Sequence, residues 1–125
     1  MRLDFWQKRI RAFRCAGRGL RMLFWSETHA RIHVVAAAAV IAAGLWLRVS
    51  ASEWLALILC IGLVIAMEAV NTAFERLTDL ISPDFHPLAG QVKDLAAGAV
   101  LWAAAIAAVV GGIVFLPRLS AIFAP

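Results

Sequence analysis

Oxygen-bearing side chains follow directly on an apolar segment in the middle of the chain. Residues 68–80 read EAVNTAFERLTDL, and fourteen apolar residues at positions 54–67 precede them without a break. If the apolar segment is helical, as a bilayer requires, the helix should continue through this row. At 100° per residue, five polar side chains then share one narrow stripe. These are Glu68, Asn71, Thr72, Glu75 and Asp79.

The chemistry open to this stripe is cation binding combined with proton transfer. Mg²⁺ binds proteins through one or two carboxylates plus substrate phosphates, and Lys93 can meet such phosphates as a point charge. Glu68 lies nearest the hydrocarbon, where an ionisable side chain costs about 2.5–3.5 kcal/mol. There it can take a proton from a lipid hydroxyl during in-line attack on a γ-phosphate. The pattern favours a phosphotransferase acting on a membrane-embedded alcohol.

Two other classes of function use the same residue types. A cation transporter or channel also needs acids within the membrane, although it predicts charges throughout the bilayer depth, and the span interiors here lack them. A structural membrane module needs none. Taken singly, Asp79 and Asp84 fit a solvated helix extension equally well, and Glu27, surrounded by cations, favours a surface salt bridge over a metal site.

The composition predicts an integral membrane protein. Of 125 residues, 63% are hydrophobic, well above the roughly 45–50% of soluble proteins. Eight of the twelve Lys and Arg residues precede the first apolar segment, where anionic lipid headgroups explain them without nucleic acid. A chain this small has little core of its own, so we expect a homo-oligomer. Cys15 and Cys60 have neither disulfide nor metal spacing.

The expected fold is all-α, with a basic amphipathic surface helix and three transmembrane helices in one domain, residues 1–125. Apolar and basic periodicity place the surface helix at about residues 5–25 and the spans at about 30–48, 54–80 and 88–116. Ser26 is a candidate cap for the helix after it. We expect Pro87 at the first position of the third span and Pro117 at its end.

The distribution of cations predicts the orientation. Residues 1–31 carry eight Lys or Arg, the turn at 48–53 carries one, residues 68–93 carry two, and one follows the third span. The positive-inside rule therefore places the N-terminus and the polar stripe in the cytoplasm. In a bacterium this is a multi-pass protein of the inner (plasma) membrane whose stripe faces ATP.

The motifs resemble those of the small bacterial diacylglycerol kinase and undecaprenol kinase family. EAVNTAFERLTDL, followed by HPLAGQVKDLAAGAV, is similar to the family pattern E-x-x-N-[ST]-A-x-E-x-x-x-D, then H-x-L, then K-D. SETHARIH, at residues 26–33, resembles the S-E-x-N-x-x-x-H stretch of the undecaprenol kinase branch. The resemblance covers nearly the whole chain with the same spacing.

The resemblance implies an ATP- and Mg²⁺-dependent lipid kinase that forms a homotrimer with sites near subunit interfaces. Glu68 matches the general base, and Glu27 and Glu75 match the Mg²⁺ ligands, in contrast to the salt bridge favoured above for Glu27. The positions that hold the nucleotide or order the site correspond to Asn71, Asp84, His86, Lys93 and Asp94. Trp46 and Ala97 match positions that line the lipid site.

Departures from the family pattern bear on the nucleotide contacts of the surface helix and on the substrate. Lys8 and Cys15 stand where the diacylglycerol kinase type has arginine and an aromatic residue. His33 and the HPLA sequence, in place of HELS, favour the undecaprenol kinase branch. The expected reaction is phosphorylation of undecaprenol to undecaprenyl phosphate, with diacylglycerol as the alternative substrate.

Overall fold

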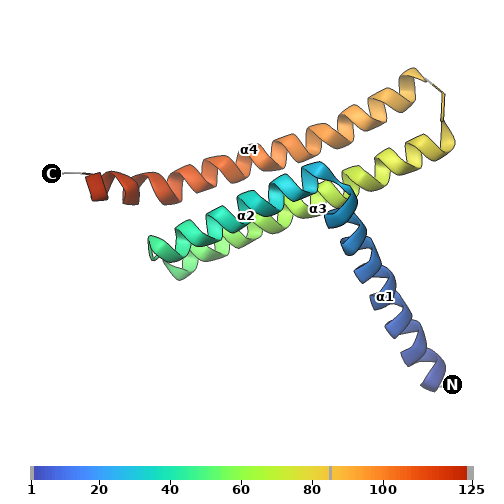
Figure 1. Ribbon diagram of the computed structural model, residues 1–125, viewed down its shortest axis with the longest axis horizontal. Helices are drawn as coiled ribbons and strands as arrows, with labels where there is room; N and C mark the ends of the chain where they lie inside the picture. Colours follow the sequence, from blue (N-terminus) through green and yellow to red (C-terminus); the bar gives the residue numbers. More distant parts are fainter. Residues whose placement is uncertain (1, 85, 124–125) are drawn as a thin grey trace.

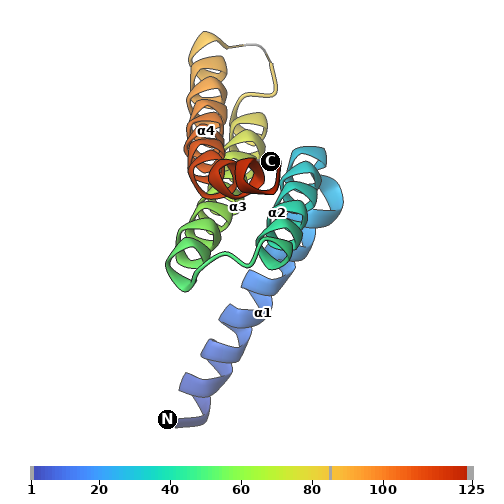
Figure 2. The same ribbon diagram turned by 90° about the vertical axis from the view of Figure 1, so that its left-hand side faces the viewer.

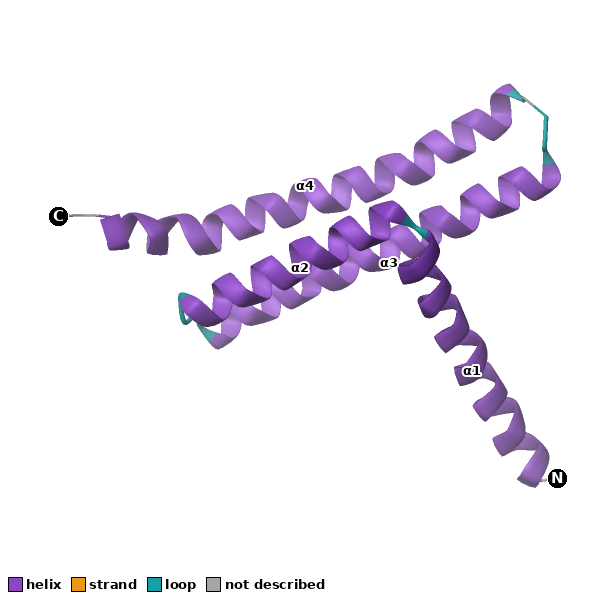
Figure 3. Cartoon of the chain, viewed as in Figure 1, coloured by secondary structure: helices purple, strands orange, loops and turns teal. Residues whose placement is uncertain are grey.

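The computed structural model describes residues 2–84 and 86–123, and within them it contains four helices and no strand (Figure 3). The helices are α1 (Arg2–Ser26), α2 (Thr28–Trp46), α3 (Ala51–Ile81) and α4 (Pro87–Phe123). Phe85, in the expected turn before Pro87, lies outside the described residues. The all-helical fold with three long apolar helices is confirmed.

Helices α2, α3 and α4 run side by side, and α3 is antiparallel to the other two (Figure 1). α3 packs against both α4 and α2, so it is the central element of the bundle. Helix α1 leaves the bundle from the start of α2 and points away from it (Figures 1 and 2). All described side chains of α1 are exposed up to Met22, and Leu23 is its first buried residue.

The length of α3 explains how one helix carries both apolar and polar segments. Its 31 residues span about 46 Å at 1.5 Å per residue, whereas the hydrocarbon core of a bilayer is about 30 Å thick. α3 is therefore longer than the hydrocarbon is thick, which leaves room for a polar segment after the apolar one in the same helix. α2, with 19 residues, is about as long as the hydrocarbon is thick.

The turn between α2 and α3 is fixed by backbone hydrogen bonds at the end of α2. The N–H of Val49 donates to Gly44 O (3.1 Å) and the N–H of Arg48 donates to Leu45 O (3.3 Å), which is the Schellman arrangement. Arg48 takes the left-handed position usually filled by glycine, with φ of 51°. Val49 is thereby buried against Leu57 and Val114.

Ser50 and Glu53 then start α3 with a capping box. The N–H of Ser50 donates to Glu53 Oε2 at 2.7 Å, and the N–H of Glu53 donates to Ser50 Oγ at 3.4 Å. Arg118 of α4 donates to both oxygens of the same carboxylate, at 2.5 and 2.6 Å. One carboxylate therefore caps α3 and joins it to α4 at the end opposite the polar stripe.

Two expected helix ends are wrong. α4 does not end at Pro117 but continues to Phe123. Pro117 has no N–H to donate to the carbonyl of Ile113, and the helix nevertheless continues past it; in this last part of α4, Arg118 Nη1 donates to Val114 O at 3.1 Å. Ser26 does not cap α2, because it is the last residue of α1, and its hydroxyl donates to Met22 O. Glu27 occupies the N-cap position instead.

Gly44 of α2 leaves room for the Trp54 side chain of α3. A Cβ at this position would lie 2.7 Å from the indole of Trp54, which packs against the buried cluster around Leu57. We predict that Gly44→Ala lowers the free energy of unfolding by about 1–3 kcal/mol, because the indole cannot shift without leaving this cluster.

The matched control is Gly62→Ala, in the middle of α3, where a Cβ would meet nothing within 4 Å. Alanine there should raise stability by up to about 1 kcal/mol through helix propensity. Thermal unfolding in detergent measures both variants. Equal effects of the two substitutions would contradict the close approach.

Candidate active site

The first part of the polar stripe of α3, which directly follows the apolar segment, is buried. Glu68 is 4% exposed, Asn71 8% and Thr72 8%, and these are the buried polar side chains among the described residues. Further along, Glu75 is partly buried and Asp79 is exposed. Val70, Leu77 and Ile81, on the opposite face, are exposed. The stripe therefore faces into the protein, and the apolar face of α3 points outward.

Glu68 is a buried carboxylate without a partner in the described part of the chain. It forms no hydrogen bond or ion pair there. A buried charge that lacks a partner is costly, so nothing in the packing of the chain itself accounts for a glutamate here. The oxygens of this carboxylate can accept a hydrogen bond from a bound hydroxyl.

The stripe continues beyond Glu68 with Asn71, Thr72 and Glu75. Asn71 Nδ2 donates to Glu75 Oε1 at 3.1 Å. Asn71 Oδ1 and Thr72 Oγ1 are buried and have no hydrogen-bond partner among the described residues. Such unpaired oxygens are rare in folded proteins, and they fit a ligand that brings donors or positive charge. Thr72 was on the predicted stripe, but the family resemblance assigned it no role.

Glu27 reaches the site from the junction of α1 and α2. Its Oε1 accepts from Arg76 Nη2 at 2.7 Å and from Ser26 Oγ at 3.0 Å. The bond from Arg76, and secondly the bond from Ser26, hold the pKa of the Glu27 carboxyl below its usual range. The salt bridge that the residue types favoured is therefore present, and Glu27 is ionised at neutral pH.

The oxygen atoms of these side chains suit a hard cation such as Mg²⁺, bound together with phosphate groups. No group of three His, Cys, Asp or Glu side chains within the described ranges is close enough to hold a metal by itself. Mg²⁺ in phosphate-transfer sites needs only one or two carboxylates, since the phosphates supply the other ligands. The carboxylates of Glu27 and Glu75, with the unpaired Asn71 Oδ1 nearby, fit this requirement.

Lys93 pairs with the stripe across the α3–α4 interface. Its Nζ lies 2.5 Å from Asp79 Oδ1; the Asp79 side chain is largely exposed, and that of Lys93 is partly buried. Asp79, which the family pattern left without a role, is thus the partner of Lys93. Asp94, the next residue, is exposed on α4.

We predict that Asp79→Asn lowers the KM for ATP by up to about fivefold, the worth of an exposed ion pair, because it frees Lys93 for phosphate. Lys93→Met should raise the same KM. Steady-state kinetics with varied ATP measure both. A rise in KM for Asp79→Asn as large as that for Lys93→Met would show that Asp79 holds Lys93 in place instead of competing for it.

The segment before α4 contributes two further predicted residues. Asp84 is exposed, and its backbone carbonyl accepts from Ser82 Oγ at 3.1 Å. His86 directly precedes α4. Its Nδ1 accepts a hydrogen bond from the N–H of Leu88 at 3.2 Å, and its carbonyl accepts one from the N–H of Gly90. Pro87 follows as the first helical residue, as predicted. The His86 ring therefore caps a helix.

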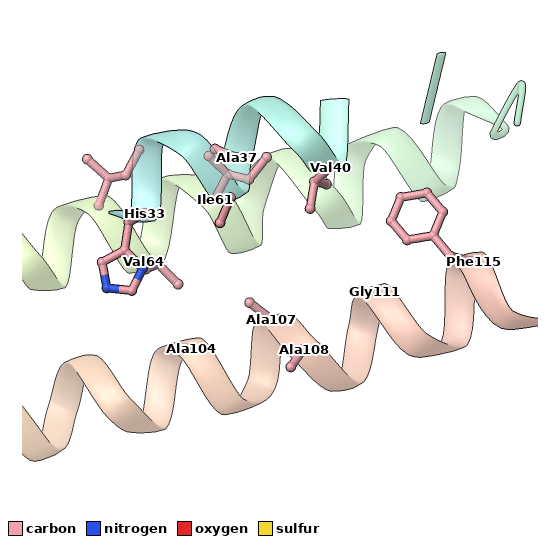
Figure 4. Close-up of a pocket in the computed structure, with 12 residues that line it drawn as sticks. His33, Ala37, Val40, Ile61, Val64, Ala104, Ala107, Ala108, Gly111 and Phe115 are labelled. Atoms are coloured by element: carbon pink, nitrogen blue, oxygen red, sulfur yellow. The ribbon is translucent and has the colours of Figure 1, made fainter. Parts of the chain in front are cut away.

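An apolar groove of about 280 Å³ lies among the three long helices. It lies between α2 and α4 with α3 as its floor, and Figure 4 shows His33 and Val64 at one end and Phe115 at the other. Alanines and Gly111 make up much of its wall. Glu68 follows Val64 by one helical turn on the same face, so its carboxylate lies beyond the His33 end of the groove.

The two residues matched to the lipid site are not together in the single chain. Trp46 ends α2 at the far end of the bundle and is 69% exposed. Ala97 is exposed on α4, four residues after Lys93. Neither lines the groove.

Comparison with known proteins identifies the family. Residues 14–115 match the family described as Prokaryotic diacylglycerol kinase. The chain is 40% identical to an undecaprenol kinase of Bacillus subtilis over 110 residues, which cover 88% of this chain and 89% of the relative. It is 39% identical to a diacylglycerol kinase of Synechocystis sp. over 123 residues, covering 95% and 70%.

A diacylglycerol kinase of Escherichia coli (strain K12) is 33% identical over 100 residues, covering 80% of this chain and 82% of the relative. The family match at residues 14–115 includes Glu27, the polar stripe of α3 and Lys93. The chain also has three helices that are long and apolar enough to cross a membrane. The chain therefore belongs to the prokaryotic diacylglycerol kinase family and is a membrane lipid kinase that phosphorylates an alcohol group.

Proposed function

We propose that this kinase transfers the γ-phosphate of ATP to undecaprenol, with Glu68 as the general base. The observation that carries the proposal is that Glu68, a buried residue whose carboxylate has no partner in the described part of the chain, follows by one helical turn Val64 at the end of an apolar groove. A hydrocarbon chain in the groove would bring its terminal hydroxyl to this carboxylate. Glu68 would then take the hydroxyl proton as the oxygen attacks the γ-phosphorus and ADP leaves.

The nucleotide would lie along the stripe on the cytoplasmic side of the membrane. Asn71, Lys93 and Asp94 are proposed to hold its phosphates and order the site, with Asp84 and His86 beside it. Glu27 and Glu75 are proposed to bind Mg²⁺. When bound, Mg²⁺ neutralises charge on the phosphate oxygens. The positions of Glu27 and Glu75 at the polar end of α3 support this assignment.

The protein is proposed to act as a homotrimer in the bacterial inner membrane, with α1 lying on the cytoplasmic surface. Exposed apolar side chains cover much of the bundle. Along the outward face of α3, two hollows of about 470 and 310 Å³ share Phe74 and Val92, and these offer a surface to a second copy. Trp46 and Ala97 would then line the lipid site from different subunits. Mass measurement of the detergent-solubilised protein tests the trimer.

Undecaprenol is favoured over diacylglycerol by the SETHARIH and HPLA sequences and by similarity to the Bacillus subtilis undecaprenol kinase. Diacylglycerol remains the second candidate, because the Synechocystis relative of nearly equal identity is a diacylglycerol kinase. Purified protein given labelled ATP, Mg²⁺ and each lipid in mixed micelles decides between them. Transfer chiefly to diacylglycerol would overturn the first assignment, and transfer to neither would overturn both.

A further inference from the structure

We propose that Arg76 is a positioning residue, which holds the Glu27 carboxylate and the end of α1 against the polar face of α3. The effect expected on Mg²⁺ dependence rests on the proposed role of Glu27 as a ligand. The effect expected on the position of α1 rests on geometry alone. The two parts can therefore be measured separately.

The guanidinium of Arg76 contacts three groups of the α1–α2 junction. Its Nη2 donates to Glu27 Oε1 at 2.7 Å and to Ser26 Oγ at 2.9 Å. Its Nη1 is directed at Met22 Sδ. All three partners lie in the last turn of α1 or immediately after it. Through these contacts α3 reaches a helix whose described side chains are otherwise exposed as far as Met22.

Arg76 also lies beside the proposed metal ligands. It follows Glu75 directly in the sequence. With Glu68 placed at 0° on the helical wheel, Arg76 falls at about 80°, next to Thr72 at about 40°. Both hydrogen bonds to Glu27 go to Oε1. The side chain is thus anchored by one oxygen, and Oε2, which has no partner among the described residues, is left for another ligand. Arg76 therefore orients Glu27 without occupying both of its oxygens.

The shape of the guanidinium matters as well as its charge. A planar fork of N–H donors can bind carboxylate, hydroxyl and thioether together, whereas a lysine ammonium on a flexible chain holds them less rigidly. Arg76→Lys should therefore keep the attraction to Glu27 but lose part of the orientation. Arg76→Ala should lose both.

The first experiment measures the position of α1 without ATP, lipid or Mg²⁺. Spin labels are placed on the native, exposed Cys15 of α1 and on Leu88→Cys at the start of α4, in a Cys60→Ala background diluted with unlabelled protein. We expect one narrow distance in the parent, loss of that narrow peak in Arg76→Ala, and partial recovery in Arg76→Lys. Arg31→Ala, whose guanidinium bonds to Thr28 within its own helix, is the matched control and should keep the narrow peak.

The second experiment measures the Mg²⁺ half-saturation of the kinase. Arg76→Ala should raise it by about 10- to 100-fold, as the loss of a residue that orients a metal ligand does, while kcat at saturating Mg²⁺ changes little. Arg76→Lys should recover part of the shift. In the Glu27→Gln background, Arg76→Ala should add little, because the group it positions is gone.

The outcomes separate this proposal from the proposed function. A narrow distance retained in Arg76→Ala would overturn the inference. Loss of that peak with an unchanged Mg²⁺ half-saturation would overturn the part that concerns Mg²⁺ binding and would support the positioning of α1. Additive effects of Arg76→Ala and Glu27→Gln would also contradict it. If the parent protein phosphorylates no lipid, the proposed function fails, and the distance measurement still decides whether Arg76 positions α1.

Discussion

Glu68→Gln is expected to lower turnover by about 100- to 10,000-fold, the range found when general acid–base catalysis is lost. The amide has nearly the shape of the carboxylate but cannot take the hydroxyl proton. Because Glu68 has no partner within the described chain, the substitution breaks no hydrogen bond or ion pair. Nucleotide affinity should therefore stay within a few-fold of the parent value, as measured by titration with a fluorescent ATP analogue, and the fold should be kept.

Glu53→Gln is the matched control, since it makes the same change in the same helix at the opposite end. It weakens the link to Arg118 and the capping box, so unfolding should occur at lower temperature. Turnover well below that temperature should be unchanged. If the Glu68 and Glu53 variants lost turnover equally, Glu68 would have no special part in the chemistry.

Glu75→Gln is expected to raise the Mg²⁺ concentration for half-maximal activity on the order of 100-fold. Mutating a residue that only orients a metal ligand already lowers metal affinity by about 10- to 100-fold, so the loss of a ligand should lie at the upper end of this range. The amide keeps an oxygen that can accept the hydrogen bond from Asn71, so the stripe should keep its local structure. What is lost is negative charge on a ligand. Kinase assays at varied Mg²⁺, with ATP saturating, measure the shift.

High Mg²⁺ should restore much of the turnover of Glu75→Gln and none of the turnover of Glu68→Gln. This contrast separates a metal ligand from a base, because only the former is rescued by mass action. The same Mg²⁺ response in both variants would contradict the division of roles along the stripe.

Helical periodicity in a bilayer made much of this protein predictable from its sequence. A segment that crosses the hydrocarbon must satisfy its backbone internally, so residues 54–80 had to be one helix, and fixed spacing then put Glu68, Asn71 and Thr72 on one face. The structure adds that Glu68, Asn71 and Thr72 on this face are buried. The motifs around it predicted the family, and the comparisons confirm the family.

Helix ends were less predictable, because they depend on the contacts that individual side chains make in the folded protein. Proline usually ends a helix, yet α4 continues past Pro117 with Arg118 donating to a carbonyl in the preceding turn. Ser26 has the residue type of a cap, but its hydroxyl bonds back into α1. Arg118 also bonds to Glu53 of α3, a contact that no rule based on neighbouring residues includes.

The sequence by itself determined the membrane spans, the polar stripe and the kind of chemistry, since these depend on residue type and helical period. Only the tertiary structure decided which groups meet: Arg76 meets Glu27, and Lys93 meets Asp79. It also formed an apolar groove that ends at Val64, one helical turn before Glu68. These pairs lie far apart in sequence, or on different helices, and no spacing rule relates them. Helix packing places them together, because α3 lies between α2 and α4 and extends past the α1 junction.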